Sequence, residues 1–259
     1  LLAGAVVKPF DVMDAVSKGV LDGGHTVPVY WYGKSKAASL FGSGPINGMD
    51  AHQTMAWIYR GGGLELYNEL LAKLNLDVVG FFALPMPTQP LGWFRKPIKD
   101  AAGLKGLKYR TVGLAADLFQ AMGTKVTQLP GGEIMPALER GVIDAFEFNN
   151  PTSDKRFGAP NVAKNYMLGS HHQATGYFEI MFNRTKFNSL PKEQQAILEY
   201  ASEAASSARA WMAMRQYSDD LQELINKDKI NVLRTPQGVF DAQIKAWDGL
   251  IAVLAKDEF

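Results

Sequence analysis

The stretch AVSKGVLDG at Ala15–Gly23 is echoed by ALERGVIDA at Ala137–Ala145. Each copy has a basic residue near the end of a predicted helix, a glycine suited to a left-handed C-cap, and an apolar entry into a strand. We expect the strands at 26–32 and 145–149. The two glycines, Gly19 and Gly141, lie 122 positions apart, which is too far for a solenoid repeat and fits two similar α/β lobes. Chance agreement between two common helix-to-strand junctions is the alternative.

Helical and strand-like patterns alternate along the rest of the chain, which favours sheets covered by helices. We predict helices over 61–74, 115–122, 132–140 and within 236–256, and strands over 78–84, 107–112, 126–129 and 230–233. The three prolines of PMPTQP at 85–90 interrupt regular structure and indicate a crossing between lobes. LPKEQQ at Leu190–Gln195 opens a helix that we expect to run to about Asp228. At about 55 Å, this helix would span both lobes or be broken.

The predicted fold is therefore α/β and two-lobed, like the class II periplasmic binding proteins, with hinge strands and a long helix that spans both lobes. We assign residues 1–86 to lobe I, 87–172 to lobe II, 173–213 to the return into lobe I with the start of the long helix, and 214–259 to lobe II with the C-terminal helix. A ligand that contacts both lobes would close the hinge.

The bulk composition narrows the range of functions. A net charge of +1 provides no field for gathering nucleic acid or anionic lipid. The absence of cysteine removes disulfides and thiolate sites. No apolar run reaches the roughly 18 residues of a spanning helix. The sequence begins at Leu1 without a signal-peptide pattern, so we expect a processed or truncated start.

Arg110 is the first candidate functional residue, because it ends the predicted strand at 107–112, where an α/β sheet presents its carboxyl ends to a cleft. Its planar guanidinium matches a carboxylate with two parallel hydrogen bonds. Glu147 follows the second echo on a largely apolar strand, and a buried carboxylate there needs a cation or donors. Gln89 offers a side-chain oxygen on the proline-rich crossing. The alternatives are a surface or ion-paired arginine, a solvated glutamate and an ordinary loop glutamine.

No nucleotide-binding, zinc-protease or serine-hydrolase motif is present. Neighbouring residues of a strand point to opposite faces, so His171 and His172 do not readily share a metal. We expect one of them to face solvent and the other to be hydrogen-bonded near a cleft. We expect His172 to contact the ligand.

In combination, these segments resemble the extracytoplasmic solute-binding proteins of TRAP transporters, in the group that binds 2-oxo acids such as pyruvate, or lactate. The matching segments are KGVLD at Lys18–Asp22, LPMPTQPLGWF at Leu84–Phe94, LKGLKYR at Leu104–Arg110, GVIDAFEF at Gly141–Phe148, and Leu190-Pro191. The resemblance covers nearly the whole chain. It implies that Arg110 takes the ligand carboxylate, that the protein works in the periplasm with integral membrane subunits, and that nucleic acid is no partner.

The resemblance also implies a cation beside the ligand, held by Gln89, Glu147 and the backbone oxygen of Phe148. Such all-oxygen ligation suits a hard cation such as sodium or calcium. Tyr30 and Trp31 are expected to reach the ligand from the opposite lobe, with core packing as their alternative role. Phe178 is expected to line the apolar end of the ligand.

Three points stay open at the level of sequence. The family often has Trp-His-Glu where this chain has His171-His172-Gln173, which bears on ligand size and metal preference. Some members pair through a swapped C-terminal helix that would lie beyond Phe259, so a homodimer is among the expected partners. The rival to a binding protein is a metal-assisted enzyme that acts on a small acid, with Glu147 as the base. A signalling sensor domain of the same fold is the third candidate.

Overall fold

The computed structural model describes residues 4–46 and 48–256, so the outer ends of the predicted lobes, at 1 and 259, lie outside the described residues. The described chain forms two units. The first unit comprises residues 4–43, 49–87 and 175–212, and the second comprises 44–46, 48, 88–174 and 213–256. Within the described residues, no helix has the length and apolar character needed to cross a membrane.

The first unit is built on an antiparallel three-stranded sheet. Its strands, in the order β1-β8-β2, are β1 (Gly23–Thr26), β8 (Gly176–Asn183) and β2 (Val78–Met86). Its helices are η1 (Pro9–Asp11), α1 (Val12–Ser17), η2 (Pro28–Gly33), α2 (Lys36–Gly42), α3 (Ala51–Arg60), α4 (Gly63–Lys73) and α9 (Arg184–Ser189). The core between sheet and helices contains the buried rings of Trp31, Tyr67, Phe82 and Tyr177.

The predicted strand at 26–32 is wrong, because β1 ends at Thr26 and residues 28–33 form the 3-10 helix η2. Pro28 explains the difference: it lacks the N–H that a ladder needs, and its fixed φ suits the first turn of a helix. Tyr30 and Trp31 therefore lie on a helical turn. Helix α3 was not predicted, although Asp50 and Gln53 form a capping box at its start.

The second unit is built on a mixed six-stranded sheet. The strands, in spatial order, are β5 (Lys125–Thr127), β4 (Lys108–Arg110), β6 (Ala145–Phe146), β3 (Gly92–Phe94), β7 (Asn165–Leu168) and β9 (Asn231–Arg234). Its helices are η3 (Ala101–Leu104), α5 (Leu114–Ala121), α6 (Gly131–Glu139), α7 (Pro151–Arg156), α8 (Ala159–Val162) and α11 (Gln237–Leu254). Strands β4, β5, β6 and β9 and helices α5, α6 and α11 match predicted elements to within a few residues, whereas β3, β7, η3, α7 and α8 were not predicted.

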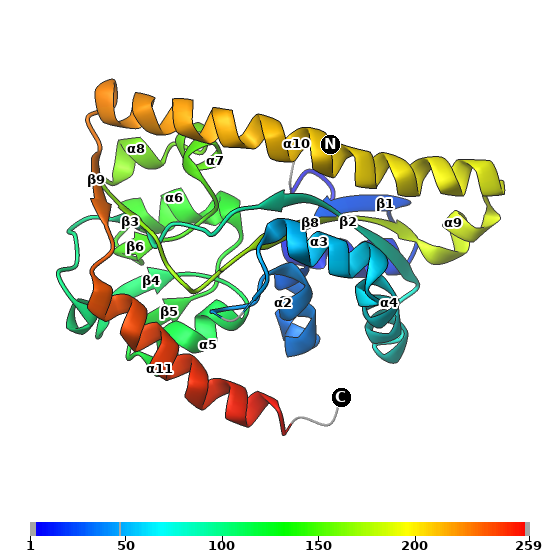
Figure 1. Cartoon of the computed structure of the whole chain (residues 1–259), viewed down its shortest axis with the longest axis horizontal. Coiled ribbons are helices and arrows are strands. Elements are labelled where there is room, and N and C mark those ends of the chain that lie inside the picture. The colour runs from blue at the N-terminus through cyan, green and yellow to red at the C-terminus, as the bar shows by residue number, and fades with distance from the viewer. Residues whose placement is uncertain (1–3, 47, 257–259) are drawn as a thin grey trace. The chain divides into compact units, whose positions relative to one another are not determined.

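Both faces of this sheet are buried, as alternation along its strands requires. Trp93, Phe146 and Tyr166 belong to one apolar cluster, whereas their chain neighbours Phe94, Ala145 and Met167 belong to another. Figure 1 shows α6, α7 and α8 on one side of the sheet and α5 and α11 on the other.

The two echoed segments end their helices in the same way. The N–H of Gly19 donates to Val16 and that of Val20 to Ala15, at 3.0 and 2.9 Å. In the second copy the corresponding bonds, Gly141 to Leu138 and Val142 to Ala137, are also 3.0 and 2.9 Å long. Both glycines adopt left-handed backbone angles, with φ of +70° and +72°. Each echo is thus a Schellman cap, as the sequence predicts.

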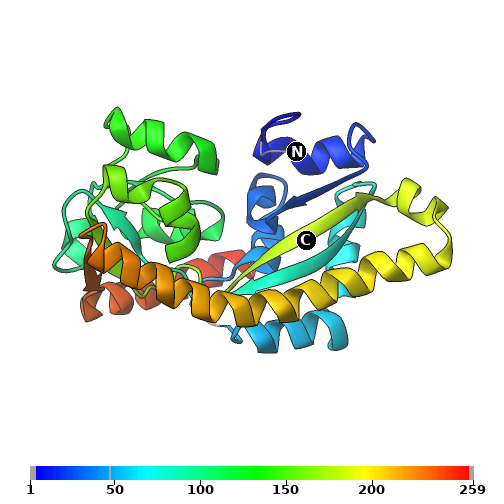
Figure 2. The same cartoon turned by 90° about the horizontal axis from the view of Figure 1, so that it is seen from above.

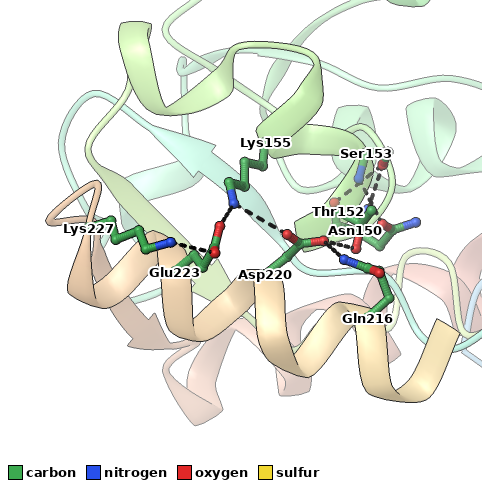
Figure 3. A network of polar contacts seen from close by, with 8 residues as sticks. All are labelled: Asn150, Thr152, Ser153, Lys155, Gln216, Asp220, Glu223 and Lys227. Atoms are coloured by element: carbon green, nitrogen blue, oxygen red, sulfur yellow. Dashed lines mark hydrogen bonds and ion pairs between the residues drawn. The ribbon is translucent and has the colours of Figure 1, made fainter. Parts of the chain in front are cut away.

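The long helix α10 runs from Lys192 to Asn226, and Figure 2 shows it as one continuous helix. Its residues up to 212 belong to the first unit and the rest to the second. In the second unit, Asp220 accepts a hydrogen bond from Thr152 of α7 at 2.6 Å and pairs with Lys155 at 3.3 Å (Figure 3). Lys155 also pairs with Glu223. This polar network fastens the last turns of α10 to α7.

Candidate functional site

Arg110 ends strand β4, and its side chain is only 1% exposed. Its Nε donates to the carbonyl oxygen of Leu129 at 2.9 Å, and its Nη1 donates to the carbonyl oxygen and to Oε1 of Glu147, at 2.8 and 2.9 Å. Nη2 has no hydrogen-bond partner among the residues that the structure describes. A buried guanidinium whose Nη2 group is unused is a ready donor for an anionic ligand.

Glu147 follows β6 directly and is 1% exposed, so the alternative of a solvated glutamate is wrong. Strands β4 and β6 are parallel neighbours, and their carboxyl ends therefore lie at the same sheet edge. Burial raises the pKa of Glu147 to about 7, against the opposing effect of the Arg110 charge. Its second carboxylate oxygen, Oε2, is buried without a hydrogen-bond partner.

Gln89 lies just before β3, is 4% exposed, and also carries a buried oxygen, Oε1, without a partner. Gly92 brings this segment close to Glu147: with φ of +114°, a Cβ at this position would meet the carbonyl oxygen of Phe146 at 2.1 Å and the Cα of Glu147 at 2.9 Å. Only glycine permits this approach. Two unpartnered, buried oxygens thus belong to neighbouring segments of the second unit.

Oxygen ligands such as these suit a hard cation, whereas nitrogen and thiolate ligands suit softer metals. Phe148, the third predicted donor through its backbone oxygen, stacks on Phe157 with the ring centroids 4.6 Å apart, and the guanidinium carbon of Arg110 is 6.0 Å from its ring centroid. In the described part of the chain, no group of three or more His, Asp or Glu side chains could hold a metal. The predicted donor set is of another kind, since it combines one carboxylate with amide and backbone oxygens.

His172 is fully buried, with its Nδ1 2.7 Å from the Ser170 hydroxyl and its Nε2 without a partner. Burial, and secondly the charge of Arg110, lower its pKa to about 3, so the ring is neutral. Both histidines lie in an irregular turn rather than on a strand. His171 is half-buried, and its ring packs edge-on against Phe240.

Tyr30, Trp31 and Phe178 belong to the first unit, and their part in ligand binding stays a prediction. Trp31 is 1% exposed and donates from Nε1 to the buried carboxylate of Glu179 at 3.3 Å, which favours its core-packing alternative. Tyr30 packs edge-on against Phe10, and the half-buried ring of Phe178 stacks on His25.

Sequence reasoning missed three buried polar residues of the second unit: Asp154, Ser170 and Gln243. Asp154 accepts from the indole of Trp93 at 2.9 Å and from two backbone N–H groups. Gln243 is the polar member of the buried stripe Val239, Gln243 and Trp247 on α11. The sequence signal for Gln243 was its spacing: it lies four residues after Val239 and four before Trp247, on the same face of the predicted helix.

The model of the family described as bacterial extracellular solute-binding protein, family 7 (DctP), matches residues 3–251. The chain belongs to this family. A curated member from Nostoc sp., named monocarboxylate 2-oxoacid-binding periplasmic protein, is 39% identical over 204 residues, which are 79% of this chain and 55% of that protein. A solute-binding protein from Sulfitobacter is 31% identical over 74% of this chain and 60% of its own length. This family member therefore spans less than two thirds of these two relatives.

Solved structures of family members have the same fold. A TRAP transporter solute-binding protein from Bordetella bronchiseptica, with copurified calcium and picolinate, has a TM-score of 0.92 and 32% identity, covering 98% of this chain and 75% of that one. A protein from Pseudoalteromonas atlantica with bound sodium and pyruvate has a TM-score of 0.89 and 32% identity, covering 96% and 75%. A Colwellia psychrerythraea protein with calcium and pyruvate has 0.88 and 34%, covering 95% and 75%. The predicted resemblance to TRAP solute-binding proteins and the predicted two-lobed α/β fold are confirmed.

Proposed function

We propose that this chain is the ligand-binding part of a TRAP transporter's periplasmic solute-binding protein, and that it captures a small 2-oxo or 2-hydroxy monocarboxylate such as pyruvate or lactate. The observation that carries the proposal is the buried Arg110, with its Nη2 group unused, in the same unit as the unpartnered oxygens of Glu147 and Gln89. The names of the similar proteins from Nostoc, Pseudoalteromonas and Colwellia support the ligand class.

Arg110 would bind the ligand carboxylate through Nη2. A second, parallel hydrogen bond needs either Nη1, whose protons are donated to the carbonyl oxygen and to Oε1 of Glu147, or Nε, which donates to the carbonyl oxygen of Leu129. Two-pronged binding through Nη1 and Nη2 therefore requires the Glu147 carboxylate to turn away from Arg110. The Nη1 proton that Arg110 donates to the Glu147 carboxylate cannot also be donated to a ligand. The position of the Glu147 carboxylate therefore decides how many hydrogen bonds Arg110 can donate to the ligand.

Gln89 and Glu147 would hold a sodium or calcium ion through side-chain oxygens, and Phe148 would contribute its backbone oxygen. When bound, the ion supplies positive charge to the carboxylate and the 2-position oxygen of the ligand. The calcium and sodium in the structures of similar proteins support this assignment. Glu147 then gains a counter-charge for its second oxygen, and this removes the penalty of a buried, half-paired carboxylate.

The proposed partners are the small acid and the integral membrane subunits of the transporter, and the proposed location is the periplasm. Pairing of two copies is a further proposal, supported by the dimer described for the Bordetella bronchiseptica protein. The rival, a metal-assisted enzyme with Glu147 as base, has no observation of its own in its support. Binding without turnover is the function we propose.

A thermal-shift and calorimetry series with pyruvate, lactate and larger acids, each with sodium, calcium or a chelator, tests the proposal. A ligand that binds only the folded chain raises its melting temperature by mass action, by an amount set by its affinity. We expect pyruvate or lactate to raise it, and the chelator to weaken the effect if the ion is calcium. Steady product formation observed by NMR would favour the enzyme instead, and the absence of any stabilising acid would contradict the proposal.

A further inference from the structure

Three hydrogen bonds in the second unit join Gln243 of helix α11 to Ser170 and to the turn that contains His171 and His172. The backbone N–H of His171 donates to Oε1 of Gln243 at 2.9 Å, Nε2 of Gln243 donates to the hydroxyl of Ser170 at 2.7 Å, and that hydroxyl lies 2.7 Å from Nδ1 of His172. Gln243 and His172 are fully buried, and Ser170 is 1% exposed. Bulk water therefore does not compete for these bonds.

The direction of each bond follows from what each atom can do. A backbone N–H only donates, so the oxygen of the Gln243 amide faces His171 and its nitrogen faces Ser170. An amide nitrogen also only donates, so one lone pair of the Ser170 hydroxyl is used. The other faces the backbone N–H of His172 at 3.4 Å. The hydroxyl proton is then left to donate to Nδ1 of His172.

A ring nitrogen that accepts a hydrogen bond carries no proton. Because burial and the charge of Arg110 lower the pKa of His172 to about 3, the ring holds a single proton, which must then be on Nε2. This Nε2–H group is buried and has no hydrogen-bond partner. Such a donor is rare in a folded protein, because an unmade buried hydrogen bond is unfavourable.

His172 is in the neighbourhood of the proposed ligand site. The residue after it, Gln173, accepts a hydrogen bond through its carbonyl from the backbone N–H of Gln89 at 3.1 Å. The charge of Arg110 contributes to the lowered pKa of His172, so the ring is within electrostatic reach of the guanidinium. An acceptor atom of a ligand beside Arg110 and Gln89 would satisfy the Nε2–H group.

We propose that Gln243, acting through Ser170, holds His172 as an Nε2–H donor to an oxygen of the ligand, and that this donor selects 2-oxo and 2-hydroxy acids against 2-amino acids. The inference rests on the proposed function. An oxo or hydroxyl oxygen accepts from Nε2–H, whereas an ammonium group only donates. The oxygens of Gln89 and Glu147 are used by the cation, so an ammonium would face donors alone. Gln243 is a positioning residue, and His172 is the residue that contacts the ligand.

Long-range proton–nitrogen NMR spectra of the protein labelled with nitrogen-15 in histidine test the relay in the free chain. The chain has four histidines, so the His172 signals can be assigned with one variant, His172→Gln. We expect Nε2 of His172 to be the protonated nitrogen and Nδ1 the bare one. A proton on Nδ1 would overturn the inference.

Gln243→Glu tests the direction of the relay with almost no change in shape. Burial raises the pKa of the introduced carboxyl, while the two donors that face it, the N–H of His171 and the Ser170 hydroxyl, oppose that rise, so the spectra are recorded well above neutral pH, where the ionised carboxylate only accepts. Ser170 must then donate to it and accept from Nδ1–H, so the ring proton of His172 moves from Nε2 to Nδ1. Gln237→Glu, at an exposed position of the same helix, is the matched control and should leave the spectrum unchanged. A ring proton that stays on Nε2 in Gln243→Glu would overturn the positioning role.

Calorimetry with pyruvate and with alanine, which differ only at the 2-position, tests the selection. We expect Gln243→Glu and His172→Leu to weaken pyruvate binding roughly five- to twenty-fold, the equivalent of one hydrogen bond, with His172→Gln recovering part of the loss through its amide N–H. Alanine should bind far more weakly than pyruvate to the wild type. If pyruvate binds without moving the Nε2–H resonance, the inference fails and the proposed function stands. If neither pyruvate nor lactate binds, both fail.

Discussion

Arg110 and Glu147 are joined by three hydrogen bonds from positions 37 residues apart. The Arg110 carbonyl accepts from the backbone N–H of Glu147 at 3.2 Å, while Nη1 of Arg110 donates to the carbonyl and the carboxylate of Glu147. The ion pair is 1% exposed on both sides. Such a pair orients the guanidinium before any ligand arrives, and its remaining donors and acceptors are the ones that a ligand and a cation can use.

Arg110→Lys tests the need for a planar fork, because it keeps the charge and removes the second donor group. We expect pyruvate binding to weaken by about 1.5–3 kcal/mol, the usual contribution of a hydrogen bond to a charged group. Calorimetry measures the loss, with circular dichroism to verify folding. Arg140→Lys, at an exposed position of the same unit, is the control. Equal affinity in wild type and Arg110→Lys would contradict the role of Arg110.

Glu147→Gln tests the link between cation and ligand. It preserves the size of the side chain but removes the charge that a cation needs, so calcium should no longer strengthen pyruvate binding. We expect the coupling between the two to fall by about 1–3 kcal/mol. The readout is the pyruvate affinity in calcium and in chelator, with Glu139→Gln, exposed on α6, as the control. A variant as sensitive to chelator as the wild type would show that Glu147 holds no cation.

Glu179→Gln should reduce the dependence of stability on pH. Burial raises the pKa of Glu179 from 4.5 to about 7, although Tyr67 and Trp31 donate to it at 2.7 and 3.3 Å. The folded chain therefore binds more protons than the unfolded chain between these pH values, and this carboxyl lowers stability as the pH rises through that window. Below the unfolded pKa of 4.5 its contribution is at its most favourable.

Relative to the wild type, Glu179→Gln should gain about 3 kcal/mol as the pH rises from about 4 to about 8, since each pKa unit corresponds to about 1.4 kcal/mol. Urea unfolding at several pH values measures the difference, and Glu65→Gln, exposed on α4, is the control. A constant difference across this range would mean that Glu179 has an ordinary pKa.

Asp220→Ala should loosen α10 from α7 in the second unit. The change leaves the hydroxyl of Thr152, which is 2% exposed, without its acceptor and removes an ion pair with Lys155. We expect a loss of about 1–3 kcal/mol, as for other buried groups left without a partner. Asp219→Ala, at the neighbouring position, is the matched control, because the pair of Asp219 with Arg215 is exposed and such pairs contribute about 0–1 kcal/mol. Equal urea midpoints for the two variants would contradict the prediction.

Gly141→Ala tests how much the left-handed glycine of the second Schellman cap contributes to stability. A Cβ at this glycine meets nothing within 4 Å, so only the left-handed φ of +72° is disturbed. We expect a loss of about 1–2 kcal/mol, and a similar loss for Gly19→Ala. Gly249→Ala within helix α11 should instead stabilise the chain by about 0.5–1 kcal/mol. If Gly19→Ala and Gly141→Ala have no effect in thermal unfolding, the shared cap contributes nothing to stability.

Local signals predicted part of the fold. The caps at Gly19 and Gly141 depend on residues within five positions of each glycine, and helices α5, α6 and α11 follow from their own apolar spacing. Two failures were local: Pro28 ends a strand that the apolar pattern alone extended, and the capping box of Asp50 and Gln53 marks the start of helix α3, which was not predicted. Strands β3, β7 and β8 and helices α2, α7, α8 and α9 were not predicted either.

The sequence by itself therefore determined the α/β class, the repeated helix caps and the chemical types of the candidate ligands, because short-range sterics and side-chain chemistry decide these. Only the tertiary structure decided that Nη1 of Arg110 is already engaged by Glu147, that Trp31 meets Glu179, and that Gln243 reaches Ser170 from 73 positions away. Such pairings depend on which buried donors and acceptors are left to satisfy each other once the sheets are assembled, and no local pattern encodes that.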